Sequence, residues 1–336
     1  MLKKEDGFPL SGDRLTEWVG FLRENGIRYE GDALYTVVLR DRSGRVAATG
    51  SLGSRILKYI VVDDAYRGEG ILSQLMTCLM EKAVELSFRK LFLYTKPGNE
   101  SIFGAYGFYK IVATDEILFM ENRKGEFDSY IKAVQARSPQ CRGRIGAVVC
   151  NCDPFTLGHR HLILRAAEEC ELVHVFVLSE DKSEFSAQLR RRMVEEGAED
   201  LKNVVVHGAG DYLISAATMP TYFIRDSSTA EEAAFRLDLA IFCRRLAPAL
   251  GITARYAGTE PLDGVTSAYN QAMRRILPGY NIAFNELPRL ESRGTVVSAS
   301  LVRGLLAQGK YAEAKLSLPE STVRLLREEG IIPRAE

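Results

Sequence analysis

The side chains best suited to chemistry in this sequence share one turn: Thr156, Gly158 and His159. The turn follows a short apolar run, Ile145 to Val149, that predicts a buried parallel strand. It precedes an apolar-periodic segment, His161 to Leu172, that predicts a helix. Such a turn directs backbone N–H groups and the positive end of a helix dipole at an anion. A hydroxyl, a glycine that admits a phosphate and an imidazole therefore suit a triphosphate attacked at its α-phosphorus.

A second stretch with phosphate-binding character lies near the C-terminus, Val297 to Arg303 (VSASLVR). We expect Ser298 or Ser300 to cap a helix there, with its amides facing phosphates. Arg303, one turn further on, can bind phosphate through its fork of donors. A plain serine cap with a surface arginine is the structural alternative.

The two stretches, in this order, resemble the (H/T)xGH and ISSTxxR-like motifs of nucleotidylyltransferases. The resemblance implies a Rossmann-like domain with a parallel sheet, in which His159, Thr156 and Arg303 are catalytic. The positions that it implies for nucleotide binding are Asn151, Asp153, Pro154, Phe155, Gly158, Lys182, Arg190, Gly258, Glu260, Ser298 and Ser300. For Lys182, a solvated charged helix is an equally good interpretation.

The N-terminal part predicts a hairpin, Leu34 to Arg40 with Arg45 to Ser51, then a strand, Ile56 to Val62. A glycine turn follows, and then a long helix from Ile71 to about Ser87. The turn sequence RGEG, with YGF downstream, resembles acetyltransferases of the GNAT family. The resemblance implies an α+β fold that holds the pyrophosphate of coenzyme A at Arg67, Gly68 and Gly70.

Two positions depart from the GNAT pattern. Leu72 is large where the family prefers a small residue, and Phe103 stands where a tyrosine often serves as general acid. We therefore expect a structural or docking domain that at most holds a coenzyme-A-like pantetheine group, rather than an independent acetyltransferase.

A chain of 336 residues predicts two domains. We place an acetyltransferase-like domain at 1–125, a linker helix at 126–143 and a nucleotidylyltransferase-like catalytic domain at 144–336, an α/β two-domain fold class. In the last domain strands alternate with helices, which predicts a parallel sheet. Its expected strands are Ile145 to Val149, Leu172 to Leu178, Val204 to Val206, Thr253 to Ala257 and Ile282 to Leu287.

Composition excludes several function classes. Lys plus Arg and Asp plus Glu both number 44, so no net charge favours nucleic acid or an anionic membrane. No apolar stretch approaches a membrane span, and the N-terminus does not resemble a secretion signal. The six cysteines lack zinc-site spacing, so we expect reduced thiols and no metal site. The prediction is a cytoplasmic protein.

The combination of both domains is similar to the citrate lyase ligase family, as are NCDPFTLGHRHLI, TYFIRD and the GTEP…YNQAM stretch from Gly258 to Met273. The resemblance implies an AMP-forming acid–thiol ligase that uses ATP, with Mg²⁺ bridging its phosphates, and acetate. The acceptor would be the dephospho-coenzyme-A-type prosthetic group on the acyl carrier subunit of citrate lyase. Acetyl-adenylate would be the intermediate, and AMP and pyrophosphate the products.

Two alternatives remain open. One is a nucleotidylyltransferase for a small phosphate ester fused to a working N-acetyltransferase. The other is a docking protein that binds ATP without catalysis.

Overall fold

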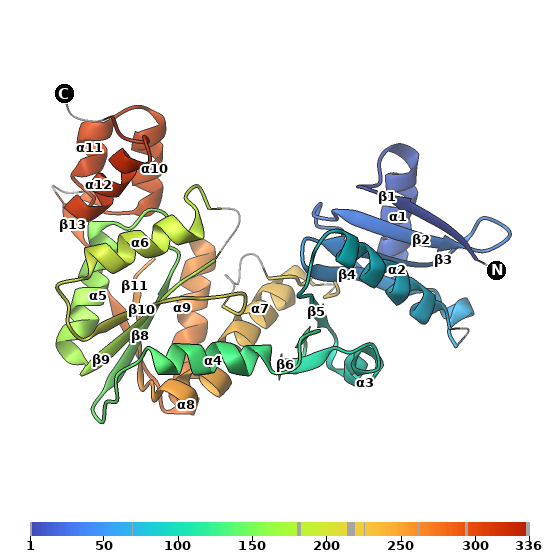
Figure 1. Ribbon diagram of the computed structural model, residues 1–336, viewed down its shortest axis with the longest axis horizontal. Helices are drawn as coiled ribbons and strands as arrows, with labels where there is room; N and C mark the ends of the chain where they lie inside the picture. The colour runs from blue at the N-terminus through green and yellow to red at the C-terminus, as the bar shows by residue number, and fades with distance from the viewer. Residues whose placement is uncertain are drawn as a thin grey trace. The chain divides into compact units, whose positions relative to one another are not determined.

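The computed structural model describes residues 2–68, 70–179, 183–213, 219–224, 226–260, 263–292 and 295–333 (Figure 1). The chain forms two compact units. The first comprises Met1–Phe127 and Met219–Ala240, and the second comprises Asp128–Thr218 and Ile241–Glu336.

The returning segment Met219–Ala240 differs from the sequence-based division, which placed all residues from 144 onward in one domain. Tyr222 accounts for its place in the first unit. The backbone N–H of Arg28 donates to the carbonyl of Tyr222 at 2.8 Å, and the Tyr222 hydroxyl donates to the carbonyl of Tyr94 at 3.4 Å. These contacts join residues far apart in the sequence, so no local sequence pattern predicts them.

The first unit contains, in the described residues, a seven-stranded sheet of order β1-β2-β3-β4-β5-β7-β6. Its strands are β1 (Lys3–Gly7), β2 (Tyr35–Arg40), β3 (Val46–Gly53), β4 (Ile56–Val62), β5 (Phe92–Thr95), β6 (Tyr109–Ala113) and β7 (Leu118–Glu121). Neighbouring strands are antiparallel except β4 and β5. The predicted hairpin is therefore present as β2 and β3.

The helices of the first unit are α1 (Gly12–Glu24), α2 (Ile71–Glu85), α3 (Glu100–Gly104) and the short 3-10 turns η1 (Asp64–Tyr66) and η2 (Pro97–Asn99). Helix α7 (Ser227–Ile241) lies almost wholly in the returning segment. The α2 residues Leu75 and Leu79 are buried in one core with residues of the sheet. A Cβ on Gly50 of β3 would lie 2.8 Å from Leu79, so this glycine allows α2 to lie close to the sheet.

The second unit contains a five-stranded parallel sheet of order β10-β9-β8-β11-β12 in the described residues. Its strands are β8 (Ile145–Cys150), β9 (Leu172–Val177), β10 (Val204–Gly208), β11 (Ala254–Gly258) and β12 (Ala283–Leu287). All five lie where the sequence predicts them. From β8 the chain adds β9 and β10 on one side, and then β11 and β12 on the other. Ligands in such sheets bind where the strand order reverses, at the carboxyl ends of the strands.

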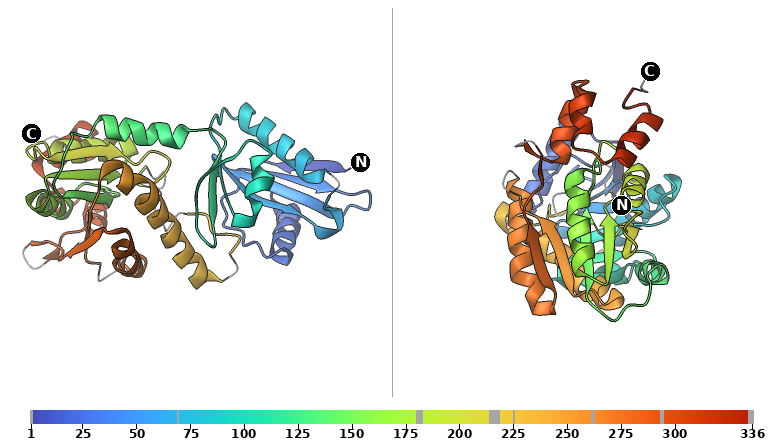
Figure 2. Two further views of the ribbon diagram at one scale, coloured as in Figure 1. Left: turned by 90° about the horizontal axis from the view of Figure 1, so that it is seen from below. Right: turned by 90° about the vertical axis from the view of Figure 1, so that its left-hand side faces the viewer.

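Helices lie on both faces of the parallel sheet (Figures 1 and 2). The described helices of this unit are α4 (Glu126–Ala136, which begins at the unit boundary), α5 (Leu157–Glu169), α6 (Ala187–Gly197), α8 (Ala247–Leu250), α9 (Gly264–Ile276), α10 (Ala299–Ala307), α11 (Tyr311–Lys315) and α12 (Glu320–Glu328). The second unit also contains short elements: a π-helix η3 (Phe242–Leu246), a 3-10 turn η4 (Leu277–Tyr280), and the paired strands β13 (Glu291–Ser292) and β14 (Thr295–Val296).

One face of the parallel sheet forms the main core of the second unit. Val173 and Val175 of β9 and Tyr256 of β11 are buried there with residues of α5, α6 and the C-terminal helices. Across the described part of the chain, no helix is both long enough and apolar enough to cross a bilayer.

Candidate functional site

The turn between β8 and α5 lies at the carboxyl end of the central strand. The sequence predicts a helix from His161, but α5 begins at Leu157, because Thr156 is its N-cap. Gly158 and His159 are therefore in its first turn, where N–H groups lack partners within the helix. Cys152, in the turn, has a left-handed backbone with φ of 53°, and the Asp153–Pro154 peptide bond is cis.

Thr156 and His159 form a reciprocal cap at the start of α5. The Thr156 hydroxyl accepts the backbone N–H of His159 at 3.4 Å, and its oxygen is 3.0 Å from the ring Nδ1 of His159. The backbone N–H of Thr156 donates to the same Nδ1 at 3.0 Å. We predicted a phosphate contact for the Thr156 hydroxyl; in the structure this side chain is 1% exposed and contacts the His159 imidazole.

The hydrogen bond to Nδ1 determines the chemistry of the His159 ring. A neutral imidazole whose Nδ1 accepts carries its proton on Nε2. Burial, with a smaller contribution from the Arg289 guanidinium, lowers the pKa of His159 from 6.5 to about 4. Near neutral pH the ring is therefore neutral. Its Nε2–H can donate a hydrogen bond to a phosphate oxygen, but the ring carries no positive charge.

Two neighbours of this pair contact other parts of the second unit. Phe155, predicted to bind nucleotide, has no exposed surface and stacks near the His159 ring at a centroid distance of 6.0 Å. Gly158, predicted to admit a phosphate, faces the second motif: a Cβ there would lie 3.2 Å from the carbonyl oxygen of Val297. Gly158 thus brings the two motifs together.

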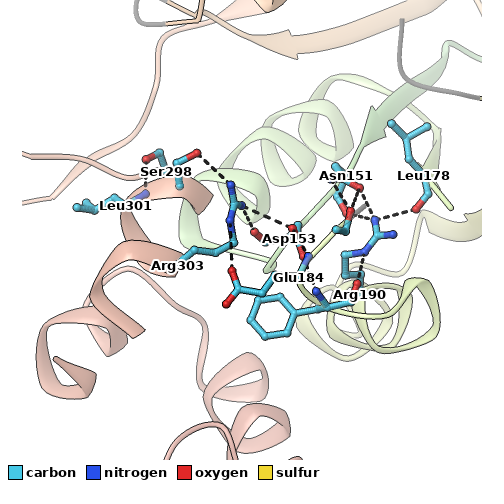
Figure 3. A network of polar contacts seen from close by, with 11 residues as sticks. Asn151, Asp153, Leu178, Glu184, Arg190, Ser298, Leu301 and Arg303 are labelled. Carbon is cyan, nitrogen blue, oxygen red and sulfur yellow. Dashed lines mark hydrogen bonds and ion pairs between the residues drawn. The ribbon is translucent and has the colours of Figure 1, made fainter. Parts of the chain in front are cut away.

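The second motif begins α10, and Ser298 is its N-cap, as predicted. The Ser298 hydroxyl accepts the N–H of Leu301 at 3.2 Å. One turn later, Arg303 donates to the carbonyl of Asp153 and, at 3.3 Å, to the Ser300 hydroxyl (Figure 3). The start of α5, the start of α10 and the Arg303 guanidinium therefore lie at one place, which is an arrangement that binds polyanions.

Two carboxylates lie close to the guanidinium of Arg303. Its guanidinium is 3.7 Å from the Asp153 carboxylate and 3.6 Å from that of Glu184 (Figure 3). Asp153 is itself fixed, because its carboxylate accepts the N–H groups of Glu184 at 3.0 Å and Phe185 at 2.9 Å. Glu184 is half exposed, so a bound phosphate can replace it at Arg303.

Arg190 does not reach the site as predicted. Its side chain is fully buried, and its guanidinium donates to the carbonyls of Asn151, Leu178 and Phe185 (Figure 3). It also donates to the side chain of Asn151. These contacts hold the ends of β8 and β9 together, so both Arg190 and Asn151 shape the turn. Pro154 is buried in the same turn. Lys182 lies outside the described residues.

The carboxyl end of β11 supplies the remaining predicted residues. Gly258 is the last residue of β11; a Cβ there would meet nothing within 4 Å among the described atoms. Glu260 forms an ion pair with Arg289, a residue that the sequence analysis did not select. A signal was available, because Arg289 follows the predicted strand Ile282 to Leu287 at its carboxyl end. The sequence analysis also did not select Glu184, which pairs with Arg303.

In the first unit, the two glycines of the predicted coenzyme A turn lie just before α2. Gly68 and Gly70 have φ of 86° and 73°, values that favour glycine, and α2 begins at Ile71. Arg67 is exposed and pairs with Asp64 at 2.6 Å. Phe103 is buried in the core, so its position offers no proton donor. Across the described residues, no three His, Cys, Asp or Glu side chains gather in a way that could hold a metal ion.

Comparisons with known proteins identify the family of the chain. The family model "Citrate lyase ligase C-terminal domain" matches residues 145–326, and the acetyltransferase (GNAT) family model matches residues 8–110. The [citrate [pro-3S]-lyase] ligase of Klebsiella pneumoniae is 38% identical over 311 residues, covering 91% of this chain and 90% of the relative. The protein of that name from Haemophilus influenzae is 35% identical over 318 residues, covering 92% and 94%.

A shorter similarity is confined to part of the chain. Phosphopantetheine adenylyltransferase of Streptococcus agalactiae is 31% identical over 114 residues, which cover 32% of this chain and 70% of the relative. The matches to the ligases extend through both units, whereas this one does not. The chain therefore belongs to the citrate lyase ligase family of enzymes.

Proposed function

We propose that this protein activates citrate lyase by joining acetate to the thiol of its acyl carrier subunit at the expense of ATP. The observation that carries the proposal is the extent of the similarity, which covers 91% of the chain and both units. The junction of the two phosphate-binding motifs supports the use of ATP, and ATP would arrive as its Mg²⁺ complex, as a substrate. We also propose that the reaction takes place in the cytoplasm.

ATP would bind at the carboxyl end of β8. The first turns of α5 and α10 present N–H groups to its phosphates, and Arg303 adds a guanidinium. Glu184 would then give up its place at Arg303 to a phosphate oxygen. Gly258 and the end of β11 leave open space beside this region, which suits the base and ribose.

The first chemical step would form acetyl-adenylate. A carboxylate oxygen of acetate attacks the α-phosphorus, the new O–P bond forms, and the bond from the α-phosphorus to the bridging oxygen breaks to release pyrophosphate. Negative charge grows on the phosphate oxygens in this step. The fixed Nε2–H donor of His159 and the donors of Arg303 would stabilise that charge without reorganisation.

The second step would transfer the acetyl group. The thiol of the prosthetic group loses its proton and attacks the acetyl carbon; the C–S bond forms, and the C–O bond to AMP breaks. We propose that the acetyltransferase-like unit holds the pantetheine-like part of this group. Its glycine turn, with Gly68 and Gly70 before α2, supports that role, and Phe103 argues against a separate acetyltransferase reaction.

Pyrophosphate release tests the proposal. ATP, acetate and the deacetylated acyl carrier subunit are supplied together, and each is omitted in turn. Release that requires acetate, with acetyl transfer to the carrier, is the expected result. Release without acetate would contradict the choice of substrate, and ATP binding without any release would favour a docking protein.

A further inference from the structure

Arg289 stands at the carboxyl end of β12, beside the site but outside both motifs. We propose that Arg289 is a further substrate-binding residue, whose guanidinium binds an anionic oxygen of the reacting groups next to His159. The proposal rests on the function proposed above, because it assigns a residue to the same site. The oxygen belongs either to a phosphate of ATP or to the carboxylate of acetate, since a guanidinium fork fits both.

Two neighbouring residues at the end of β11 hold the Arg289 guanidinium in place. Its Nε donates to the carbonyl of Thr259 at 2.8 Å, and it pairs with the carboxylate of Glu260, whose side chain is 9% exposed. These two contacts engage two of the five N–H groups of the fork. The side chain of Arg289 is 26% exposed, so part of it faces solvent and a ligand can reach it. A donor fixed in this way loses little side-chain freedom when a ligand binds.

The position of Arg289 relative to His159 follows from a short chain of contacts. The next residue, Leu290, accepts the N–H of Val297 at 2.9 Å. The carbonyl of Val297 in turn lies against Gly158, the neighbour of His159. Strands β11 and β8 are adjacent and parallel, so their carboxyl ends meet at the same edge. The Arg289 charge also contributes to the lowered pKa of His159, which agrees with this proximity.

The site has a chemical need for such a residue. Attack of a carboxylate on a phosphate brings two anions together, and His159 is neutral near pH 7. Arg303 also faces the carboxylate of Asp153, which offsets part of its charge even after Glu184 is displaced. A second guanidinium, on the β11 side, would reduce the repulsion between the reactants as they meet.

The test compares Arg289→Gln, Arg289→Lys and the control Arg324→Gln. Arg324 also forms ion pairs with glutamates, but it lies on the exposed surface of α12. For Arg289→Gln we expect the KM for either ATP or acetate to rise about 10- to 100-fold, with a smaller change in kcat. A rise in KM and calorimetric Kd for ATP identifies a phosphate; a rise in KM for acetate alone identifies the carboxylate. Arg289→Lys keeps the charge and should recover part of the loss.

Two readouts do not depend on turnover, so they separate this proposal from the proposed function. One is the calorimetric Kd for ATP. The other is the pKa of His159, followed by NMR and assigned with His159→Asn, which should rise in folded Arg289→Gln. If wild type releases no pyrophosphate, the proposed function fails, and these two readouts still decide the placement of Arg289. Unchanged ATP affinity, acetate KM and His159 pKa in folded Arg289→Gln, or equal losses in Arg324→Gln, would overturn the proposal.

Discussion

Replacing His159 with asparagine or with glutamine tests the roles of its two ring nitrogens one at a time. Asparagine places an amide near the position of Nδ1, so its oxygen can still accept the backbone N–H of Thr156. Glutamine is longer and can place an N–H donor near the position of Nε2. We expect His159→Asn to keep the helix start intact but to lose pyrophosphate release, and His159→Gln to retain part of the activity.

The magnitude follows from the state of the ring. The pKa of His159 falls from 6.5 to about 4, chiefly through burial. That shift corresponds to about 3 kcal/mol against protonation in the free enzyme. The lost interaction is therefore a neutral donor to a developing oxyanion, and the loss of such a donor lowers kcat about 10²- to 10³-fold. Stability should change by less than about 1 kcal/mol in His159→Asn, because the capping contact is kept.

The assay is steady-state pyrophosphate release, with kcat/KM measured between pH 5.5 and 8. Since kcat/KM reports the free enzyme, we expect no loss of rate from His159 titration in this range. Melting curves of both variants check the fold. A loss of rate with a pKa near 6.5 that is absent in His159→Gln, or full activity in folded His159→Asn, would refute the reasoning.

Three further predictions concern buried residues of the second unit. Burial lowers the pKa of His174 to about 4, and burial together with His174 lowers that of His207 to about 3. Because the unfolded chain then binds more protons, the free energy of unfolding should fall by about 2 kcal/mol per imidazole from pH 7 to pH 5, as denaturant titrations would show. Gly197→Ala would place a Cβ too close to the Phe155 ring, so we expect the free energy of unfolding to fall by about 1 to 3 kcal/mol in chemical denaturation, with slower pyrophosphate release. Arg190→Met should cost about 3 to 5 kcal/mol, because several buried carbonyls lose their donor, and calorimetric melting should report it.

Matched variants control the last two measurements. Gly20→Ala fills open space within α1 and should be neutral or stabilising by about 0.5 to 1 kcal/mol. Arg191→Met removes an exposed arginine that pairs with Glu195 and should have little effect. Similar losses in a control and its partner variant would show that the site contacts are not the cause.

The parallel sheet and the two helix starts were predictable from sequence, because each depends on a local pattern. That the two motifs meet is a tertiary contact, and it was expected only from the resemblance to nucleotidylyltransferases. The apolar run at β8 and the turn residues after it specify a strand followed by a helix start. The serine before α10 specifies a cap. The N-terminal edge strand β1, by contrast, is polar (KKEDG) and has no alternating pattern, so its sequence does not predict a strand.

Roles that depend on tertiary packing were not predictable. Phe155 belongs to the same motif as His159, but it is buried in the core. Arg190, in the segment after β9, is also buried and donates to backbone carbonyls. Tyr222 joins the first unit through contacts with Arg28 and Tyr94, which are distant in sequence. A motif identifies a region of chemistry; only the packing separates the side chains that face a ligand from those that support them.

The central claim is that acetate attacks the α-phosphorus of ATP at the β8–α5 turn. The most direct test supplies acetate labelled with ¹⁸O in its carboxylate, together with ATP and the thiol form of the carrier, and analyses the products by mass spectrometry. Acetyl-adenylate formation followed by C–O cleavage leaves one acetate oxygen in AMP, so labelled AMP is the predicted result. Unlabelled AMP, with ¹⁸O in phosphate or pyrophosphate, would contradict the account.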